Sequence, residues 1–356
     1  MTMLTIERRK SLLTTLAENI LDRNAADFWL QKMNPLWSVH QALGQVVKKE
    51  QTAADTVCLT LQTNRYFNVG QAGQHHPVIV EYQGRRYERT YSLTQLDAKH
   101  VLLTVKKVEQ GIVSQYLTEQ IKVGQVLEFG QPYGDMLVTQ NQPILLLAAG
   151  SGITPMFSLI NALTKTKTSD QAPIQLMYWV KTQADVAFKQ YFQQLVQQNP
   201  NFKFQVFYTQ EQQADARLNQ QHADLIQDLA SHTVYACGPS GFVAKAEALF
   251  AQAQVFKSEA FSLTPIISDE IGFIQVTLTK SNKSISIPKG QSILVGLEQQ
   301  NIKPEFGCRM GICNKCVCHK AQGATKNLVN GSENTEPGHP LKICVNTAQT
   351  DLVIDL

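Results

Sequence analysis

Four cysteines near the end of the chain have the spacing of metal ligands. Four residues separate Cys308 from Cys313, two separate Cys313 from Cys316, and Cys344 follows after a longer gap. This spacing is typical of four thiolates that hold the two irons of a [2Fe–2S] cluster. A zinc ribbon would instead pair two CxxC motifs, and this chain has one. We therefore predict a cluster bound by these four cysteines, with Cys318 as a small core residue or a free thiol.

The carboxyl-terminal segment around these cysteines resembles a plant-type ferredoxin. The resemblance implies an α+β (β-grasp) domain in which a glycine-containing loop wraps the cluster. Ferredoxins that act as separate proteins are strongly acidic, whereas residues 266–356 hold nine Lys or Arg and eight Asp or Glu. A ferredoxin tethered to its reductase needs no charge to recruit it, because the linker supplies a high effective concentration.

Residues 89–93 read Arg-Thr-Tyr-Ser-Leu, and residues 111–114 read Gly-Ile-Val-Ser. These two segments resemble the R-x-Y-S-[LT] and G-x-x-S signatures of the ferredoxin–NADP⁺ reductase superfamily. The resemblance implies a flavin site on an antiparallel barrel. The residue types suit this ligand, because arginine offers a planar fork to phosphate and serine a hydroxyl to the flavin N5. Backbone N–H groups at the helix start near the G-x-x-S pattern would add to the phosphate site. We expect FAD in preference to FMN, with Ser92 in a catalytic role. The residues expected to bind the flavin are Arg89, Tyr91, Ser92, Leu93, Gly111 and Ser114.

A tight turn joins an expected strand at 144–149 to an expected helix that begins at Pro155. A Gly-Ser-Gly turn lets the backbone approach a pyrophosphate, with the helix amino terminus behind it. Proline also suits the first helical position. The same G-[ST]-G-[IL]-[AT]-P pattern occurs in the superfamily, which implies a nicotinamide coenzyme. We expect it to be bound here by Gly150, Ser151, Gly152, Thr154 and Pro155.

A Cys-Gly-Pro motif, formed by Cys237, Gly238 and Pro239, follows an expected strand at 233–236. In the superfamily this thiol lies near the nicotinamide C4, so the resemblance implies a catalytic role for Cys237. The segment 259–261 matches the end of this domain in relatives, where it approaches the flavin.

The choice between NADPH and NADH stays open. Lys181 and Arg217 follow expected strands and are suited to bind a 2′-phosphate. NADPH-dependent relatives often carry a Ser/Thr-Arg pair where this chain has Thr209-Gln210, which weakens that assignment. We favour NADPH because of the two cations. The eight histidines are scattered, and we expect His75, His76 and His319 to be hydrogen-bonded surface groups and not ligands.

Length and composition limit the remaining possibilities. A chain of 356 residues, 43% of them hydrophobic, suggests two or three globular domains. The net charge of +3 argues against a nucleic-acid partner. The sequence has neither a secretory signal pattern nor the roughly 20-residue apolar run of a spanning helix. We expect a cytoplasmic protein that is associated with a membrane only through its partner or its first 40 residues.

These motifs must be positioned by several domains. We expect a helical extension at 1–40, an FAD-binding barrel at 41–138, an NAD(P)-binding domain at 139–264 and a [2Fe–2S] domain at 265–356. Periodicity in the second range predicts short strands, and alternating strands and helices in the third predict a parallel sheet. The expected strands are 57–61, 77–82, 87–93, 101–108, 144–149, 174–180, 203–208, 233–236, 273–279, 284–287 and 352–354. The expected helices are 11–31, 114–120, one from 155 onward, 185–198, 223–230, 241–253 and 292–300.

Three modules in this order form a one-chain electron relay from NAD(P)H through flavin to the cluster. The first 40 residues, with Trp29 and Trp37, are similar to bacterial reductases that serve membrane-bound fatty acyl desaturases. They are either a structural cap or a dock for a partner or membrane. We expect a desaturase or a related di-iron hydroxylase as the electron acceptor. The alternatives are the reductase of a ring-hydroxylating or phenylacetyl-CoA-type oxygenase and, from another class, a redox-sensing binding protein.

Overall fold

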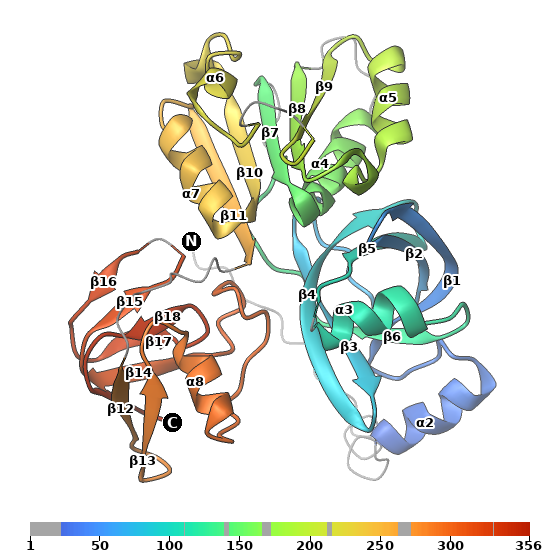
Figure 1. Ribbon diagram of the computed structural model, residues 1–356. Coiled ribbons are helices and arrows are strands. Elements are labelled where there is room, and N and C mark those ends of the chain that lie inside the picture. Colours follow the sequence, from blue (N-terminus) through green and yellow to red (C-terminus); the bar gives the residue numbers. More distant parts are fainter. Residues whose placement is uncertain are drawn as a thin grey trace, which may run out of the picture.

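The molecule consists of three lobes that follow one another along the chain (Figure 1). The computed structural model describes residues 23–109, 111–138, 142–165, 172–211, 216–262, 272–329 and 331–356. An antiparallel barrel comes first, then a parallel sheet flanked by helices, then a smaller domain with a mixed sheet. This is the fold class that the sequence predicts. The predicted extension is described from helix α2 (Arg23–Met33) onward, and the rest of the predicted helix 11–31 lies outside the described residues.

Six antiparallel strands close the barrel in the order β1-β2-β5-β4-β3-β6. Their inward side chains, such as Leu59 and Leu103, are fully buried. The first strand was not predicted, because only its first half carries buried apolar residues and the rest is largely polar. The strands are β1 (Ala42–Ala53), β2 (Thr56–Thr63), β3 (His75–Tyr82), β4 (Arg85–Gln95), β5 (His100–Lys106) and β6 (Val126–Phe129).

A short helical segment connects β5 to β6. It comprises α3 (Ile112–Gln115), capped by Gly111, and a π-helical turn η1 (Tyr116–Gln120). The helix predicted at 114–120 therefore starts two residues earlier, at Ile112, and its second half is a π-helix.

The second lobe has five parallel strands in the order β11-β10-β7-β8-β9, with its core on both faces of the sheet. Its strands are β7 (Ile144–Ala149), β8 (Ile174–Val180), β9 (Phe202–Tyr208), β10 (Thr233–Pro239) and β11 (Val255–Ser262). The helical segments are η2 (Gly150–Gly152), α4 (Ile153–Lys165), η3 (Gln183–Asp185), α5 (Lys189–Gln198), α6 (Gln220–Ala223), η4 (Leu229–Ser231) and α7 (Ser240–Leu249).

Three helix predictions in this lobe are corrected. The helix predicted at 185–198 begins only at Lys189, after Phe188 in the left-handed conformation. The helix predicted at 223–230 is instead the single turn α6, which starts after the side-chain cap of Asn219. A left-handed residue, Asp228, then interrupts the chain before η4. Helix α4 begins at Ile153, so Pro155 is its third residue, where its missing N–H still costs no intrahelical bond.

The third lobe has a sheet in the order β13-β12-β19-β14-β17, a small second sheet β16-β15-β18, and helix α8 (Ile293–Gln299). Strand β12 (Phe273–Leu278) pairs in parallel with β19 (Leu352–Ile354), which gives the β-grasp arrangement. The remaining strands are β13 (Lys283–Pro288), β14 (Val317–Gln322), β15 (Thr325–Asn327), β16 (Glu333–Asn334), β17 (His339–Lys342) and β18 (Asn346–Ala348). Cys318 is buried in this core.

Candidate functional site

A cavity of about 470 Å³ lies between the barrel, the parallel-sheet domain and the cysteine loop. Five of the six residues predicted to bind flavin line it, namely Arg89, Tyr91, Ser92, Gly111 and Ser114. The sixth, Leu93, is buried in the barrel core instead. The cavity is lined by four consecutive residues of β4, 89–92, and Leu93 lies just beyond them, where the strand enters the buried interior of the barrel.

The electrostatics of this cavity favour an anion. Lys106 and Lys107, at the end of β5, line it together with Arg89 and Arg309. Burial lowers the pKa of Arg89, and the nearby charge of Arg309 lowers it further. Cations brought this close are stabilised by a bound phosphate, so the cavity fits the phosphate groups of a flavin cofactor. Sequence reasoning missed both lysines, although they directly precede the G-x-x-S pattern.

The two neighbouring histidines of β3 are buried, which corrects the prediction that they lie on the surface. His75 and His76 are each 1% exposed, because both begin a strand that is covered on its two faces. His76 binds the carbonyl of Asn68 through Nε2, at 2.9 Å. Its Nδ1 is buried and has no partner within the described part of the chain, and burial lowers the pKa of His76 to about 4. His319 is exposed, as predicted.

His75 connects the flavin cavity to a buried carboxylate. Its Nδ1 lies 2.9 Å from Oγ of Ser92, and its Nε2 contacts Oε2 of Glu259, which comes from β11. Glu259 is 7% exposed, and its Oε1 has no partner among the described residues. The ring of Phe261 packs edge-on against His75 and lines the cavity. This chain of polar groups can hold or move a proton at the Ser92 hydroxyl.

A second cavity, of about 780 Å³, opens at the carboxyl ends of β7, β8 and β10. Of the residues predicted to bind the coenzyme, those that line it are Gly150, Ser151, Lys181, Arg217 and Pro239. Lys245 from α7 also lines it and was not predicted. A cleft at the carboxyl edge of a parallel sheet, with cations at its wall, suits a dinucleotide.

The other predicted coenzyme residues lie elsewhere. Gly152, Pro155, Cys237 and Gly238 are buried behind the wall of this cavity, and Thr154 lines the flavin cavity. Cys237 is completely buried, which raises the pKa of its thiol well above the usual range. In this arrangement the thiol contributes to the core and faces neither cavity.

The two glycines of the Gly-Ser-Gly turn have different physical roles. Gly150 has a φ of +56°, which favours glycine. Gly152 packs against β10 so closely that a Cβ would lie 2.0 Å from the carbonyl oxygen of Cys237. The turn after β7 therefore packs directly on β10 through Gly152, while Gly150 and Ser151 line the coenzyme cavity.

The two cavities are adjacent. Lys106, Val108, Ser151 and Phe261 line both of them. The flavin cavity in turn reaches the cysteine loop, since Cys308 and Met310 form part of its wall. A coenzyme, a flavin and a cluster bound at these places would lie in one continuous series.

The four predicted ligands form two pairs of thiols. Sγ of Cys316 lies 3.1 Å from Sγ of Cys344. Sγ of Cys308 accepts the N–H of Cys313 at 3.4 Å, and Sγ of Cys313 accepts the N–H of Cys308 at 3.3 Å. Two pairs suit two irons, because each iron of a [2Fe–2S] cluster takes two thiolates.

The loop around these thiols is shaped to stabilise negative sulfur. Arg309, Gly311 and Asn314 have positive φ angles, which turns the backbone N–H groups inward. The N–H of Met310 points to Sγ of Cys308 at 3.3 Å. The hydrogen bond between the two thiols lowers the pKa of Cys313 and raises the pKa of Cys308, so one thiol of this pair favours the thiolate that binds iron. The donor set therefore fits the cluster.

Three family models match successive parts of the chain. A family model described as the oxidoreductase FAD-binding domain matches residues 43–137. The oxidoreductase NAD-binding domain matches 146–248. The 2Fe-2S iron-sulfur cluster binding domain matches 276–347. The chain therefore contains the domains for FAD, a nicotinamide coenzyme and a [2Fe–2S] cluster, as the sequence predicts.

Individual relatives share this organisation along most of the chain. An NADPH oxidoreductase of Mycobacterium tuberculosis is 29% identical, over 93% of this chain and 88% of its own. NADH oxidoreductase HCR of Escherichia coli is 28% identical, over 78% of this chain and 86% of its own. The solved structure of phthalate dioxygenase reductase has a similar fold, with a TM-score of 0.64, 23% identity and coverage of 89% of this chain and 98% of that one.

No helix among the described residues is long and apolar enough to span a membrane. The family matches and the shared fold agree with the order of the cavities and the thiol loop along the chain. The chain belongs to the ferredoxin–NADP⁺ reductase superfamily, as an NAD(P)H-dependent electron-transfer oxidoreductase with a carboxyl-terminal [2Fe–2S] domain.

Proposed function

We propose that this reductase supplies electrons from NADPH to a membrane-bound fatty acyl desaturase or a related di-iron hydroxylase. The observation that carries the proposal is an exposed aromatic face on α2 and the segment after it, held rigidly on the barrel. The electron relay leads to the cluster, and the aromatic face would bring the acceptor or its membrane to the protein.

In the proposed electron transfer, the protein positions its cofactors and controls the proton of the Ser92 hydroxyl. When bound, the flavin accepts hydride from the coenzyme and the cluster carries electrons away singly. Arg89 and Lys106 would hold the flavin phosphates, and the hydroxyl of Ser92 would be the hydrogen-bond donor to the flavin N5. His75 and Glu259 orient that hydroxyl and exchange its proton, because they form a hydrogen-bonded chain that is screened from water.

The coenzyme residues act at a distance from the reacting atoms. Ser151 and the turn that contains it bind the pyrophosphate, whereas Lys181 and Arg217 bind the 2′-phosphate. Phe261, which lines both cavities, excludes water from the point where the two rings meet. Cys308, Cys313, Cys316 and Cys344 hold the cluster.

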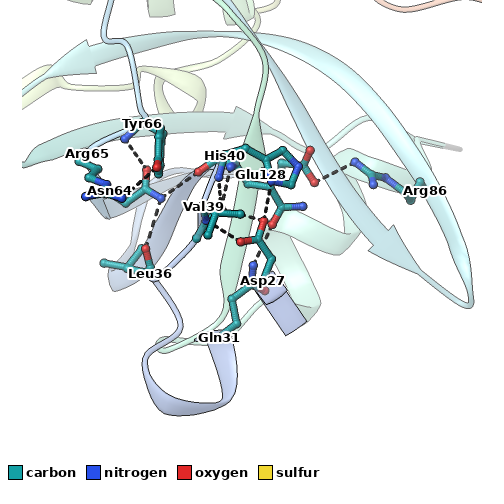
Figure 2. Close-up of polar contacts among 12 residues, drawn as sticks. Asp27, Gln31, Leu36, Val39, His40, Asn64, Arg65, Tyr66, Arg86 and Glu128 are labelled. Atoms are coloured by element: carbon teal, nitrogen blue, oxygen red, sulfur yellow. Dashed lines mark hydrogen bonds and ion pairs between the residues drawn. The ribbon is translucent and has the colours of Figure 1, made fainter. Parts of the chain in front are cut away.

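One buried carboxylate joins α2 to the segment that leads into the barrel, as Figure 2 shows. Asp27 of α2 is 2% exposed and accepts the N–H of Val39 at 2.6 Å and the hydroxyl of Ser38 at 2.9 Å. Its other contact is Nδ1 of His40, at 2.9 Å. Asn64 of the barrel donates to the carbonyl of Leu36, at 3.2 Å. These bonds hold the segment 34–40 in one orientation.

The solvent-exposed surface of α2 and of the segment after it carries large apolar side chains. Phe28, Trp29, Met33 and Trp37 are 55%, 69%, 76% and 48% exposed. Large exposed aromatic side chains with a polar edge are typical of interfaces with proteins and with membrane headgroups. Lys32 lies over the ring of Phe28 and adds a positive charge to this face. These features support a partner at a membrane surface.

A second candidate is the reductase component of a ring-hydroxylating oxygenase. The shared fold with phthalate dioxygenase reductase favours it. Such an acceptor would meet the cluster directly and would not need the aromatic face on α2. The two candidates therefore differ in their dependence on Trp29 and Met33.

The test is reconstitution with membranes that contain an acyl-CoA desaturase but no reductase of their own. We expect the pair Trp29→Ala and Met33→Ala to slow desaturation about tenfold or more, as loss of an interface hot spot does. NADPH–ferricyanide turnover should not change. Leu225→Ala, at a residue that is 53% exposed on the coenzyme domain, is the matched control.

Three outcomes would count against the proposal. Equal desaturation by the variant and the native protein would show that the aromatic face is not used. Support of a purified ring-hydroxylating oxygenase, with none of the desaturase, would favour the second candidate. Negligible ferricyanide turnover with full cofactor content would favour a redox sensor over an electron-transfer enzyme.

A further inference from the structure

We propose that the ion pair between Lys315 and Glu88 docks the cluster loop on the barrel domain and so positions the cluster to receive electrons from the flavin. The inference rests on the assignment of the four cysteine ligands. It concerns residues that neither bind a cofactor nor take part in hydride transfer.

The ion pair joins a residue of the cluster loop to a residue next to the flavin cavity. Lys315 stands between the ligands Cys313 and Cys316, and Glu88 directly precedes Arg89. Nζ of Lys315 lies 2.7 Å from Oε1 and 2.6 Å from Oε2 of Glu88. The pair therefore connects the loop that holds the cluster to the strand that lines the flavin cavity.

Close packing surrounds the pair. A Cβ on Gly307 would lie 3.0 Å from Oε1 of Glu88 and 2.9 Å from Sγ of Cys313, so the carboxylate is in contact with the cluster loop itself. The hydroxyl of Tyr133 bonds to Thr90, at 2.5 Å, next to this contact.

In the part of the chain that the structure describes, the carboxyl-terminal domain meets the barrel through its cysteine loop. Among the described residues, no helix or strand of the carboxyl-terminal domain packs extensively on a helix or strand of the other two domains. Figure 1 shows this domain as a separate lobe beside the barrel. Arg309, the other charged residue of the loop, is paired with Glu298 of its own domain. The position of the loop therefore depends strongly on Lys315 and Glu88.

The ion pair between Lys315 and Glu88 can form and break reversibly, because both side chains are partly exposed to solvent. Its side chains are 46% and 20% exposed, so dissolved salt can screen their attraction. Each electron that passes oxidises the flavin by one electron and reduces one iron from ferric to ferrous, with no bond broken. The rate of such a transfer falls steeply with distance, so loss of the docked position should slow this step alone.

The test is rapid mixing of the holoprotein with NADPH in the absence of oxygen. The flavin band reports hydride transfer, and the cluster band reports the next step. At low salt we expect Lys315→Gln to slow cluster reduction about threefold to fivefold, the scale of a partly exposed ion pair, without changing hydride transfer. Added salt should slow the native protein to the same extent and leave the variant unaffected.

A matched control uses another ion pair on the same strand. Arg86 lies two residues before Glu88 and pairs with Glu128 of the barrel, at 2.8 Å. Arg86→Gln should leave both phases unchanged. Exchange of the charges in Glu88→Lys with Lys315→Glu should restore cluster reduction that Lys315→Glu alone has slowed.

Small-angle scattering gives a second readout that does not depend on turnover. We expect Lys315→Gln to be more extended than the native protein at low salt. Unchanged scattering with an unchanged rate would overturn the proposal. A slower rate with unchanged scattering and a shifted reduction potential of the cluster would also overturn it. Lys315 would then act on the reduction potential and not on the position of the loop. If the native protein lacks cluster absorbance, the ligand assignment fails instead.

Discussion

The coenzyme cavity makes a quantitative prediction about the choice between NADPH and NADH. Lys181 and Arg217 line its wall, and Lys245 lies on the helix that borders it. A hydrogen bond to a charged group contributes about 1.5–3 kcal/mol, and the lower value suits a cavity that is open to water. Since 1.4 kcal/mol corresponds to about tenfold, Arg217→Ala should lower kcat/KM for NADPH about tenfold. Together with Lys181→Ala the loss should approach a hundredfold if the effects add.

The assay is steady-state reduction of ferricyanide with each coenzyme, analysed for kcat and KM separately. The 2′-phosphate is remote from the hydride that moves, so we expect KM for NADPH to rise while kcat stays constant. Parameters for NADH should change less than about twofold, because NADH has no phosphate to lose. Lys203→Ala, at an exposed lysine of β9 outside the cavity, is the control. Equal losses with both coenzymes, or none with either, would refute the reasoning.

Three further predictions concern the flavin, the cluster and the barrel. Cys313→Ser should abolish cluster absorbance while NADPH–ferricyanide turnover survives, and an unaltered cluster spectrum would remove Cys313 from the ligand set. Arg89→Ala should purify with little FAD, measured as the ratio of flavin to protein, and full loading would contradict its role at the phosphates. His76 has a pKa of about 4 in the fold against about 6.5 when unfolded, so the unfolded state binds more protons between these values. The free energy of unfolding of the barrel, measured in urea, should therefore fall by roughly 3 kcal/mol as the pH drops from 6.5 to 4, and His76→Gln should remove this dependence.

Short-range patterns in the sequence predicted the three cofactors and the fold class, which the family matches confirm. The cysteine spacing is local, because three of the four ligands come from one loop. The motifs at Arg89 and Gly150 are local too, since each follows a strand and supplies backbone and side-chain groups from neighbouring residues. The individual residue roles stay predictions, and the burial of Leu93 and Cys237 shows that members of one motif can differ in their access to a cavity.

Local patterns were misleading where the solvent exposure of a residue depended on distant parts of the chain. His75 and His76 look like surface residues in the sequence because they follow a glycine-rich loop, but the closed barrel and β11 bury them. The helix predicted at 223–230 failed because a left-handed residue at Asp228 interrupts an otherwise helical pattern.

The sequence by itself therefore determined the cofactors and the domain types, because the motifs that indicate them are formed mainly by groups that are close along the chain. Only the tertiary structure brought Glu259 to His75, across 184 residues, and Lys315 to Glu88, across 227. It also decided which face of α2 is exposed, through the burial of Asp27 against the segment 38–40. Contacts of this kind leave no periodic signal, since a single pair of polar groups is fixed only when whole domains have packed.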